Sequence, residues 1–122
     1  MGKERPIISG VINPRTKENE HFQNKVLRPI IKMQHLILMR VLITHAKKRK
    51  IDFSILNENK IKDHIKTILT KDIAFRNYIL GIITGHLSIS EYDSYALKSS
   101  EYNKRIIQMC NERFQKGISE LL

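Results

Sequence analysis

The sequence predicts an all-α protein: a single small bundle of four to five helices preceded by an extended N-terminal arm. Apolar residues recur at helical spacing from about residue 21 to the end of the chain. No stretch shows the period-two alternation with paired turn signals that is typical of β-strands. Because 122 residues is the length of one domain, we expect an arm over residues 1–20 and one helical domain over residues 21–122.

The arm is predicted to be extended because Pro6 and Pro14 both disfavour helix. Its apolar pairs, Ile7–Ile8 and Val11–Ile12, favour an arm that lies against another surface, although a disordered terminus is an equally ordinary interpretation. If the arm is ordered on a partner, its four cations would join the basic surface described next. These cations are Lys3, Arg5, Arg15 and Lys17.

Residues 21–50 are predicted to form one long helix, which Pro29 should kink. On a helical projection, one side is apolar and is expected to face the core; it carries Phe22, Val26, Ile30, Met33, Ile37 and Val41, and is widened by Leu27, Leu38 and Leu42. The opposite side carries a basic stripe about 80° wide, formed by His21, Lys25, Arg28, Lys32 and His35. Such a stripe is either a phosphate-binding surface or a solvated helix face, and the sequence favours neither.

This helix ends in four consecutive cations, Lys47, Lys48, Arg49 and Lys50. Cations at a helix C-terminus interact favourably with its exposed carbonyl groups, by roughly 0.3–1 kcal/mol each. That effect accounts for one or two of the four. We therefore predict that the run is part of an anion-facing patch, with a solvated helix end as the alternative.

Three further helical stretches are expected. Residues 57–70 have the spacing of an amphipathic helix, whereas residues 72–87 are apolar on almost every side and should form the most buried element. Ser88 and Glu91 have the spacing of a capping box and predict the start of a last stretch, broken near Ser99–Ser100. Cys110, the only cysteine, is expected in the core of that stretch.

Charge is distributed unevenly along the chain. Residues 1–50 contain twelve Lys and Arg against three Glu, a balance of +9, whereas residues 51–122 contain ten against nine, a balance of +1. A localised positive excess favours a polyanionic partner such as nucleic acid, and an anionic membrane is the competing possibility. With a single cysteine and no stretch resembling a signal peptide, the chain is expected to be soluble and cytoplasmic.

The sequence does not indicate catalysis. The five histidines fit no HExxH or CxxC arrangement, and there is no Walker A or GxGxxG loop. No catalytic residues, no metal ligands and no cofactor are therefore predicted.

Three segments, FQNKVLRPIIKMQ (22–34), DIAFRNYILGIITGHLSISEYDSY (72–95) and NKRIIQMCNERF (103–114), resemble a family of short helical proteins from Bacteroidetes. The resemblance covers about residues 20–115, and its members often carry the label "glyoxalase". That label implies a metal-binding βαβββ lyase, for which this chain has neither strands nor ligands, so we reject it. The resemblance also implies an association with a lineage-specific protein of the bacterial ribosome's large subunit.

Together these observations predict a non-catalytic, basic helical protein that binds structured RNA, with rRNA and neighbouring ribosomal proteins as partners. The contacts would come from the arm cations, from Lys25, Arg28 and Lys32, and from residues 47–50. The alternative is a protein-interaction module, such as a homodimeric bundle or an adaptor, without any nucleic-acid role. A DNA-binding helix-turn-helix over residues 75–114 ranks third, because its recognition segment would carry Glu91, Asp93 and Glu101. An enzyme ranks fourth.

Overall fold

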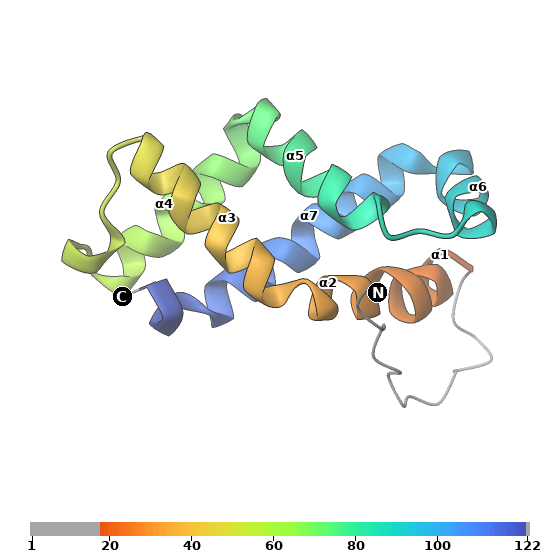
Figure 1. The fold of residues 1–122 in the computed structure, drawn as a ribbon, viewed down its shortest axis with the longest axis horizontal. Helices are drawn as coiled ribbons and strands as arrows, with labels where there is room; N and C mark the ends of the chain where they lie inside the picture. The colour runs from red at the N-terminus through yellow and green to blue at the C-terminus, as the bar shows by residue number, and fades with distance from the viewer. Residues whose placement is uncertain (1–17, 122) are drawn as a thin grey trace.

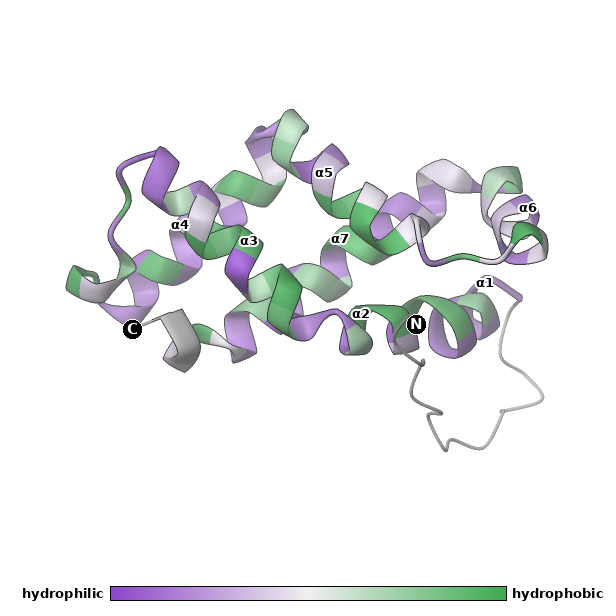
Figure 2. Cartoon of the chain, in the orientation of Figure 1, coloured by the Kyte–Doolittle hydropathy of each residue, from purple (hydrophilic) through white to green (hydrophobic). Residues whose placement is uncertain are grey.

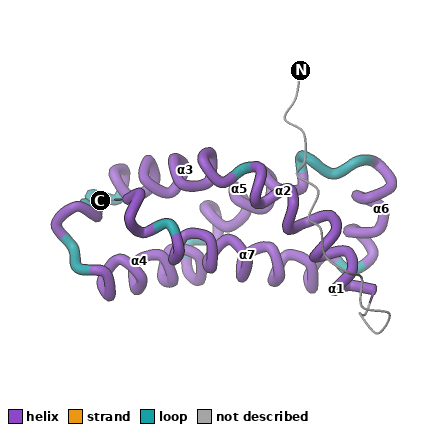
Figure 3. The backbone as a smooth tube through the Cα atoms, turned by 90° about the horizontal axis from the view of Figure 1, so that it is seen from below, coloured by secondary structure: helices purple, strands orange, loops and turns teal. Residues whose placement is uncertain are grey.

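The computed structural model describes residues 18–121, so nearly all of the predicted arm falls outside it. Within this range the chain passes from helix to helix and contains no strand (Figure 3). The all-α prediction is therefore confirmed. Side chains are described for residues 18–119.

The helices follow one another with short connections, and the first three run on without interruption. In chain order the elements are α1 (Glu18–Phe22), the π-helical turn η1 (Gln23–Leu27), α2 (Arg28–Met33), α3 (His35–Lys48), the 3-10 turn η2 (Phe53–Ile55), α4 (Glu58–Lys71), α5 (Ile73–Thr84), α6 (Ile89–Leu97), α7 (Ser99–Lys116) and the 3-10 turn η3 (Ile118–Leu121). Taking α1, η1 and α2 as one segment, the described residues form six helices rather than the predicted four to five.

The C-terminal helix α7 is the axis of the fold. It runs along much of the length of the molecule and packs against α2, α3, α4, α5 and α6 (Figure 1). Its apolar residues recur three or four positions apart, so they lie on connected faces of the helix. The buried side chains of α7 are Tyr102, Ile106, Met109, Cys110 and Phe114.

Cys110 lies in the middle of this buried face with no exposed surface. Burial raises the pKa of its thiol to about 12, against a smaller lowering by Arg113. The prediction of a core cysteine is confirmed. At neutral pH the thiol is protonated, and so it lacks the thiolate character of a nucleophile.

The predicted helix over residues 21–50 is irregular in two places, of which the first, at Pro29, was expected and the second was not. The π-helical turn η1 contains Lys25, whose carbonyl a regular α-helix would bring against the ring of Pro29. The widened turn removes this clash, so the expected irregularity at Pro29 is present. A second interruption occurs at Gln34, which leaves helical geometry (φ −94°, ψ 15°) between α2 and α3.

The interruption at Gln34 changes which side of α3 faces the core. A projection drawn through one continuous helix places Ile37 on the buried side, yet Ile37 is 41% exposed and Leu36 is 78% exposed. The buried residues of α3 are Leu38, Met39, Leu42 and Ala46. Gln34 itself is buried, and its amide lies 2.6 Å from the Nε2 atom of His86, which begins the connection after α5. The buried amide of Gln34 is thus paired with the connection between α5 and α6.

The α4 and α5 helices behave differently from each other. α4 is amphipathic as predicted: Ile61, Ile65, Ile68 and Leu69 are buried, and apolar and polar residues alternate along its ribbon (Figure 2). α5 is not the most buried element, because α4 and α7 cover only part of its apolar surface. Its exposed residues include Ile73 and Tyr78.

The α6 helix begins with the predicted capping box. The backbone amide of Glu91 donates to Ser88 Oγ (3.2 Å), and the amide of Ser88 donates to Glu91 Oε1 (2.8 Å). The expected break near Ser99–Ser100 is also found, since α6 ends at Leu97 and α7 begins at Ser99. Tyr95 and Tyr102 stack with ring centroids 6.3 Å apart, so these tyrosines pack between helices.

Two isoleucines provide a matched test of this core. Ile106 is fully buried on α7, whereas Ile89 is 85% exposed on α6. We expect Ile106→Ala to lower the free energy of unfolding by about 2–5 kcal/mol through lost burial and the cavity left behind. Ile89→Ala should change it by less than about 0.5 kcal/mol. Urea unfolding followed by circular dichroism measures both, and equal effects of the two substitutions would contradict this arrangement of the core.

Candidate nucleic-acid interface

The predicted contact residues fall into three groups in the structure. Lys3, Arg5, Arg15 and Lys17 lie outside the described residues. Lys25 on η1 with Arg28 and Lys32 on α2 form a group that we call the α2 cations. Lys47, Lys48, Arg49 and Lys50, at the end of α3, are called the α3-end cations.

The α2 cations do not belong to one straight stripe. His21 lies on α1, Lys25 on the wider turn η1 and His35 on α3, beyond the interruption at Gln34. Arg28 and Lys32 remain neighbours, one turn apart on α2. Lys25 and Lys32 are exposed, and half-buried Arg28 donates from Nε to the side-chain oxygen of Asn24 at 3.4 Å.

A shallow cavity of about 260 Å³ between α2 and α7 extends this basic surface. Its charged lining residues are Arg28 from α2 and Glu112, Arg113 and Lys116 from α7. Sequence analysis missed Arg113 and Lys116, because only the fold brings the last turn of α7 beside α2. The positive charge near Arg28 therefore comes from two helices.

The α3-end cations are held in a Schellman motif. The amide of Lys50 donates to the carbonyl of Lys47 (3.0 Å), and the amide of Ile51 donates to the carbonyl of Ala46 (2.8 Å). This motif requires a left-handed residue, normally glycine, and Lys50 occupies that position with φ 58°. It is the only non-glycine residue with positive φ among residues 18–121. A left-handed L-residue costs roughly 1–2 kcal/mol.

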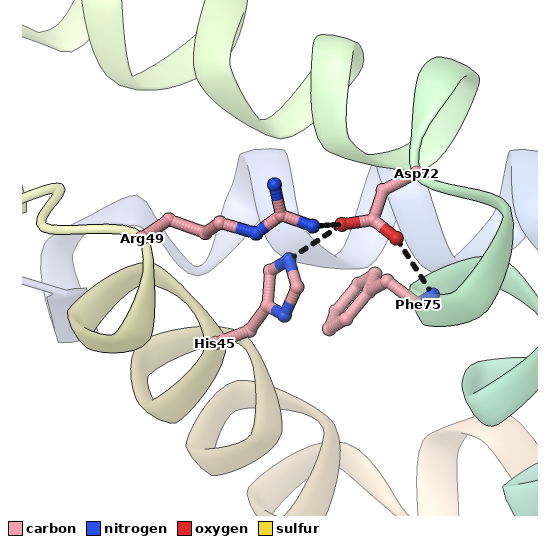
Figure 4. Close-up of polar contacts among 4 residues, drawn as sticks. All are labelled: His45, Arg49, Asp72 and Phe75. Carbon is pink, nitrogen blue, oxygen red and sulfur yellow. Dashed lines mark hydrogen bonds and ion pairs between the residues drawn. The ribbon is translucent and has the colours of Figure 1, made fainter.

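Arg49 differs from its neighbours because it is paired inside the protein. Its Nη2 atom lies 2.6 Å from Asp72 Oδ2, and His45 Nε2 lies 3.0 Å from the same oxygen (Figure 4). The other oxygen of Asp72 accepts from the backbone amide of Phe75 at 3.0 Å, which caps α5. Asp72 thus joins the end of α3 to the junction of α4 and α5, and Arg49 is better described as a structural residue than as a free contact.

These interactions hold the pKa of Asp72 below its ordinary value. The hydrogen bond from the Phe75 amide has the largest effect, and Arg49 and His45 add to it against an opposing effect of burial. A carboxyl whose pKa is lower in the folded state stabilises the fold above its unfolded pKa. That contribution is lost as the pH falls through the folded pKa.

The two cation groups lie at opposite ends of α3. With fourteen residues in α3 and a rise of 1.5 Å per residue, they are separated by about 20 Å along its axis. A ligand that contacts both must therefore extend over at least that distance.

Other kinds of site are not indicated by the described part of the chain. No three or more His, Cys, Asp or Glu side chains among residues 18–119 are grouped so that they could hold a metal ion. In the same range, none of the helices combines the length and apolar character needed to cross a membrane.

The role of Asp72 can be tested with Asp72→Asn, which keeps an oxygen acceptor for the Phe75 amide but removes the charge facing Arg49 and His45. We expect the variant to be less stable than the wild type at pH 7. The difference should begin to shrink as the pH falls below about 4, where the carboxyl of the unfolded chain takes up a proton, and should be lost as the pH falls through the lower pKa of the folded state. Thermal unfolding across this pH range measures the effect, and a difference independent of pH would rule out a role for the charge.

Comparisons with known proteins identify no relative of this chain: no family model, no curated protein and no solved structure matches it. Its function therefore has to be argued from its own residues.

Proposed function

We propose that the protein binds structured RNA through phosphate contacts, without catalysis, and that it is a ribosome-associated protein. The observation that carries the proposal is the concentration of Lys and Arg in residues 1–50, most of which are exposed where the structure describes them. Lysine and arginine that replace the counterions of a phosphate backbone contribute affinity that does not depend on sequence. The shape of the RNA would supply the specificity.

Most of the proposed cations that the structure describes have no carboxylate partner there. Among the side chains of residues 18–119, no ion pair is formed by Lys25, Arg28, Lys32, Lys48 or Lys50. The pKa of Asp52 is lowered mainly by its hydrogen bonds with Ser54, and the nearby charge of Lys47 lowers it further, against an opposing effect of burial. Cations that are not neutralised within the protein remain available for an external anion.

The strained backbone of Lys50 gives separate support. A glycine at this position would satisfy the same Schellman motif without the left-handed cost. The chain instead places a fourth consecutive cation there. A contact made by the Lys50 side chain would explain why the strain is tolerated.

A protein-interaction module is the second candidate, favoured by exposed apolar residues on α6. This helix has no buried residue, and Ile89 and Leu97 are both strongly exposed. Light scattering after size exclusion distinguishes the candidates. A salt-insensitive oligomer from which no RNA co-purifies favours the second.

The ribosomal part of the proposal is tested by sedimenting ribosomes from the native source at moderate and high salt and identifying bound proteins by mass spectrometry. Association that weakens as salt rises is expected from phosphate contacts. Absence of the protein from the particles at both salt concentrations would refute the ribosomal assignment.

The α2 cations are tested by the triple substitution Lys25→Glu, Arg28→Glu and Lys32→Glu. We expect RNA retention to be lost while helicity is kept. With milder Lys→Gln and Arg→Gln changes, the slope of log K against log salt should fall by about 2–3. The matched control exchanges Lys60, Lys66 and Lys104 for Glu, which alters net charge equally at exposed positions on α4 and α7. Equal losses in the two triple variants would show that only net charge matters.

Lys50 is tested by comparing Lys50→Gly with Lys50→Gln. The glycine variant relieves the left-handed strain, so we expect it to unfold with a free energy about 1 kcal/mol higher than the wild type. Its RNA affinity should fall, with a salt slope smaller by about 0.9. Lys50→Gln keeps the strain and removes the charge, so it should lose affinity without gaining stability. Unaltered RNA binding by both variants would remove Lys50 from the interface.

A further inference from the structure

A hollow between α3 and α5 is lined by apolar and aromatic residues as well as by cations, which distinguishes it from the two cation groups. It has a volume of about 400 Å³, and Asp72 and Arg49 are among the residues that line it. α3 and α5 both pack on α7, and near the hollow they are joined by the Asp72 contacts and by the rings of His45 and Phe75 (Figures 1 and 4).

The floor of the hollow is apolar and aromatic. Val41 comes from α3, and Ala74, Phe75 and Tyr78 come from α5. Phe75 is buried, and its ring is fixed against that of His45 with centroids 4.4 Å apart. Tyr78 is 60% exposed, so a large part of its surface is available to a planar group entering the hollow.

The lining also carries two exposed cations, which we call the rim of the hollow. They are Arg40 and Lys48, which lie two turns apart on α3. Asp72 is the acidic residue on the lining, and its charge is opposed by Arg49 and His45. An occupant with an apolar, planar body and negative charge at its edges complements this arrangement.

We infer that the hollow receives an unpaired nucleotide of the bound RNA, with its base against Tyr78 and its phosphates at Arg40 and Lys48. This inference rests on the proposed function. Proteins recognise single-stranded loops and bulges by stacking splayed bases on aromatic side chains, while nearby cations hold the backbone. Lys48 belongs to both the rim and the α3-end cations, so the hollow continues the proposed interface.

The experiment compares two fluorescently labelled RNA hairpins whose strands are joined by the same non-nucleotide linker, one fully paired and one with a single unpaired purine in its stem. Binding is measured by fluorescence anisotropy at low salt. The wild type should bind the bulged hairpin more tightly. Tyr78→Ala should weaken that complex by about 5- to 150-fold, the range found for base–aromatic stacking. The fully paired hairpin should be affected less than about twofold.

Two variants serve as controls. Tyr78→Phe keeps the ring and should retain the preference for the bulge. Tyr92→Ala removes another exposed tyrosine, on α6, and should leave both affinities unchanged. Circular dichroism confirms that each variant is folded, which is expected because Tyr78 is mostly exposed.

The outcomes separate this inference from the proposed function. If both hairpins bind but the wild type does not prefer the bulge, or Tyr78→Ala weakens both equally, the nucleotide pocket is refuted and RNA binding stands. If neither hairpin binds, the proposed function and the pocket fall together. If an acidic amphipathic peptide binds the hollow and neither RNA does, the hollow is a site for a protein partner and not for a nucleotide.

Discussion

Burial of one face of α7 is the constraint on which the rest of the structure depends. Ile106, Cys110 and Phe114 have no exposed surface, and the helices from α2 to α6 all contact α7. α1 reaches it too, because the ring of Phe22 lies 4.6 Å from that of Tyr102. A shared central helix lets its neighbours stay partly uncovered on their outer sides. This is why α5, although apolar nearly throughout, still exposes Ile73 and Tyr78.

Asp72, at the junction of α4 and α5, connects these helices to α3, which otherwise meets them mainly through α7. Asp72 caps α5 and holds Arg49 and His45, and so it fixes the end of α3. The fold thereby positions Lys48 and Lys50 through a residue that carries the opposite charge. In the proposed interface, one acidic residue would orient the cations around it while its own charge is balanced by Arg49.

Local sequence patterns predicted the parts of the fold that depend on local chemistry. The capping box at Ser88, the irregularity at Pro29 and the buried Cys110 all follow from residues near them in the chain. The interruption at Gln34 was not foreseen, because no proline or glycine marks it. That one break put Ile37 on the wrong side of the helical projection. Arg113 was missed because only tertiary packing brings it beside Arg28.

The burial of Cys110 provides a built-in probe of how often the core opens. As the only thiol in the chain, and with no exposed surface, it meets a solvent reagent only when α7 separates from its neighbours. Its modification rate therefore reports opening of the core without any introduced label. Applied to variants of the basic surface, this readout would distinguish those that loosen the bundle from those that alter only its exposed charge.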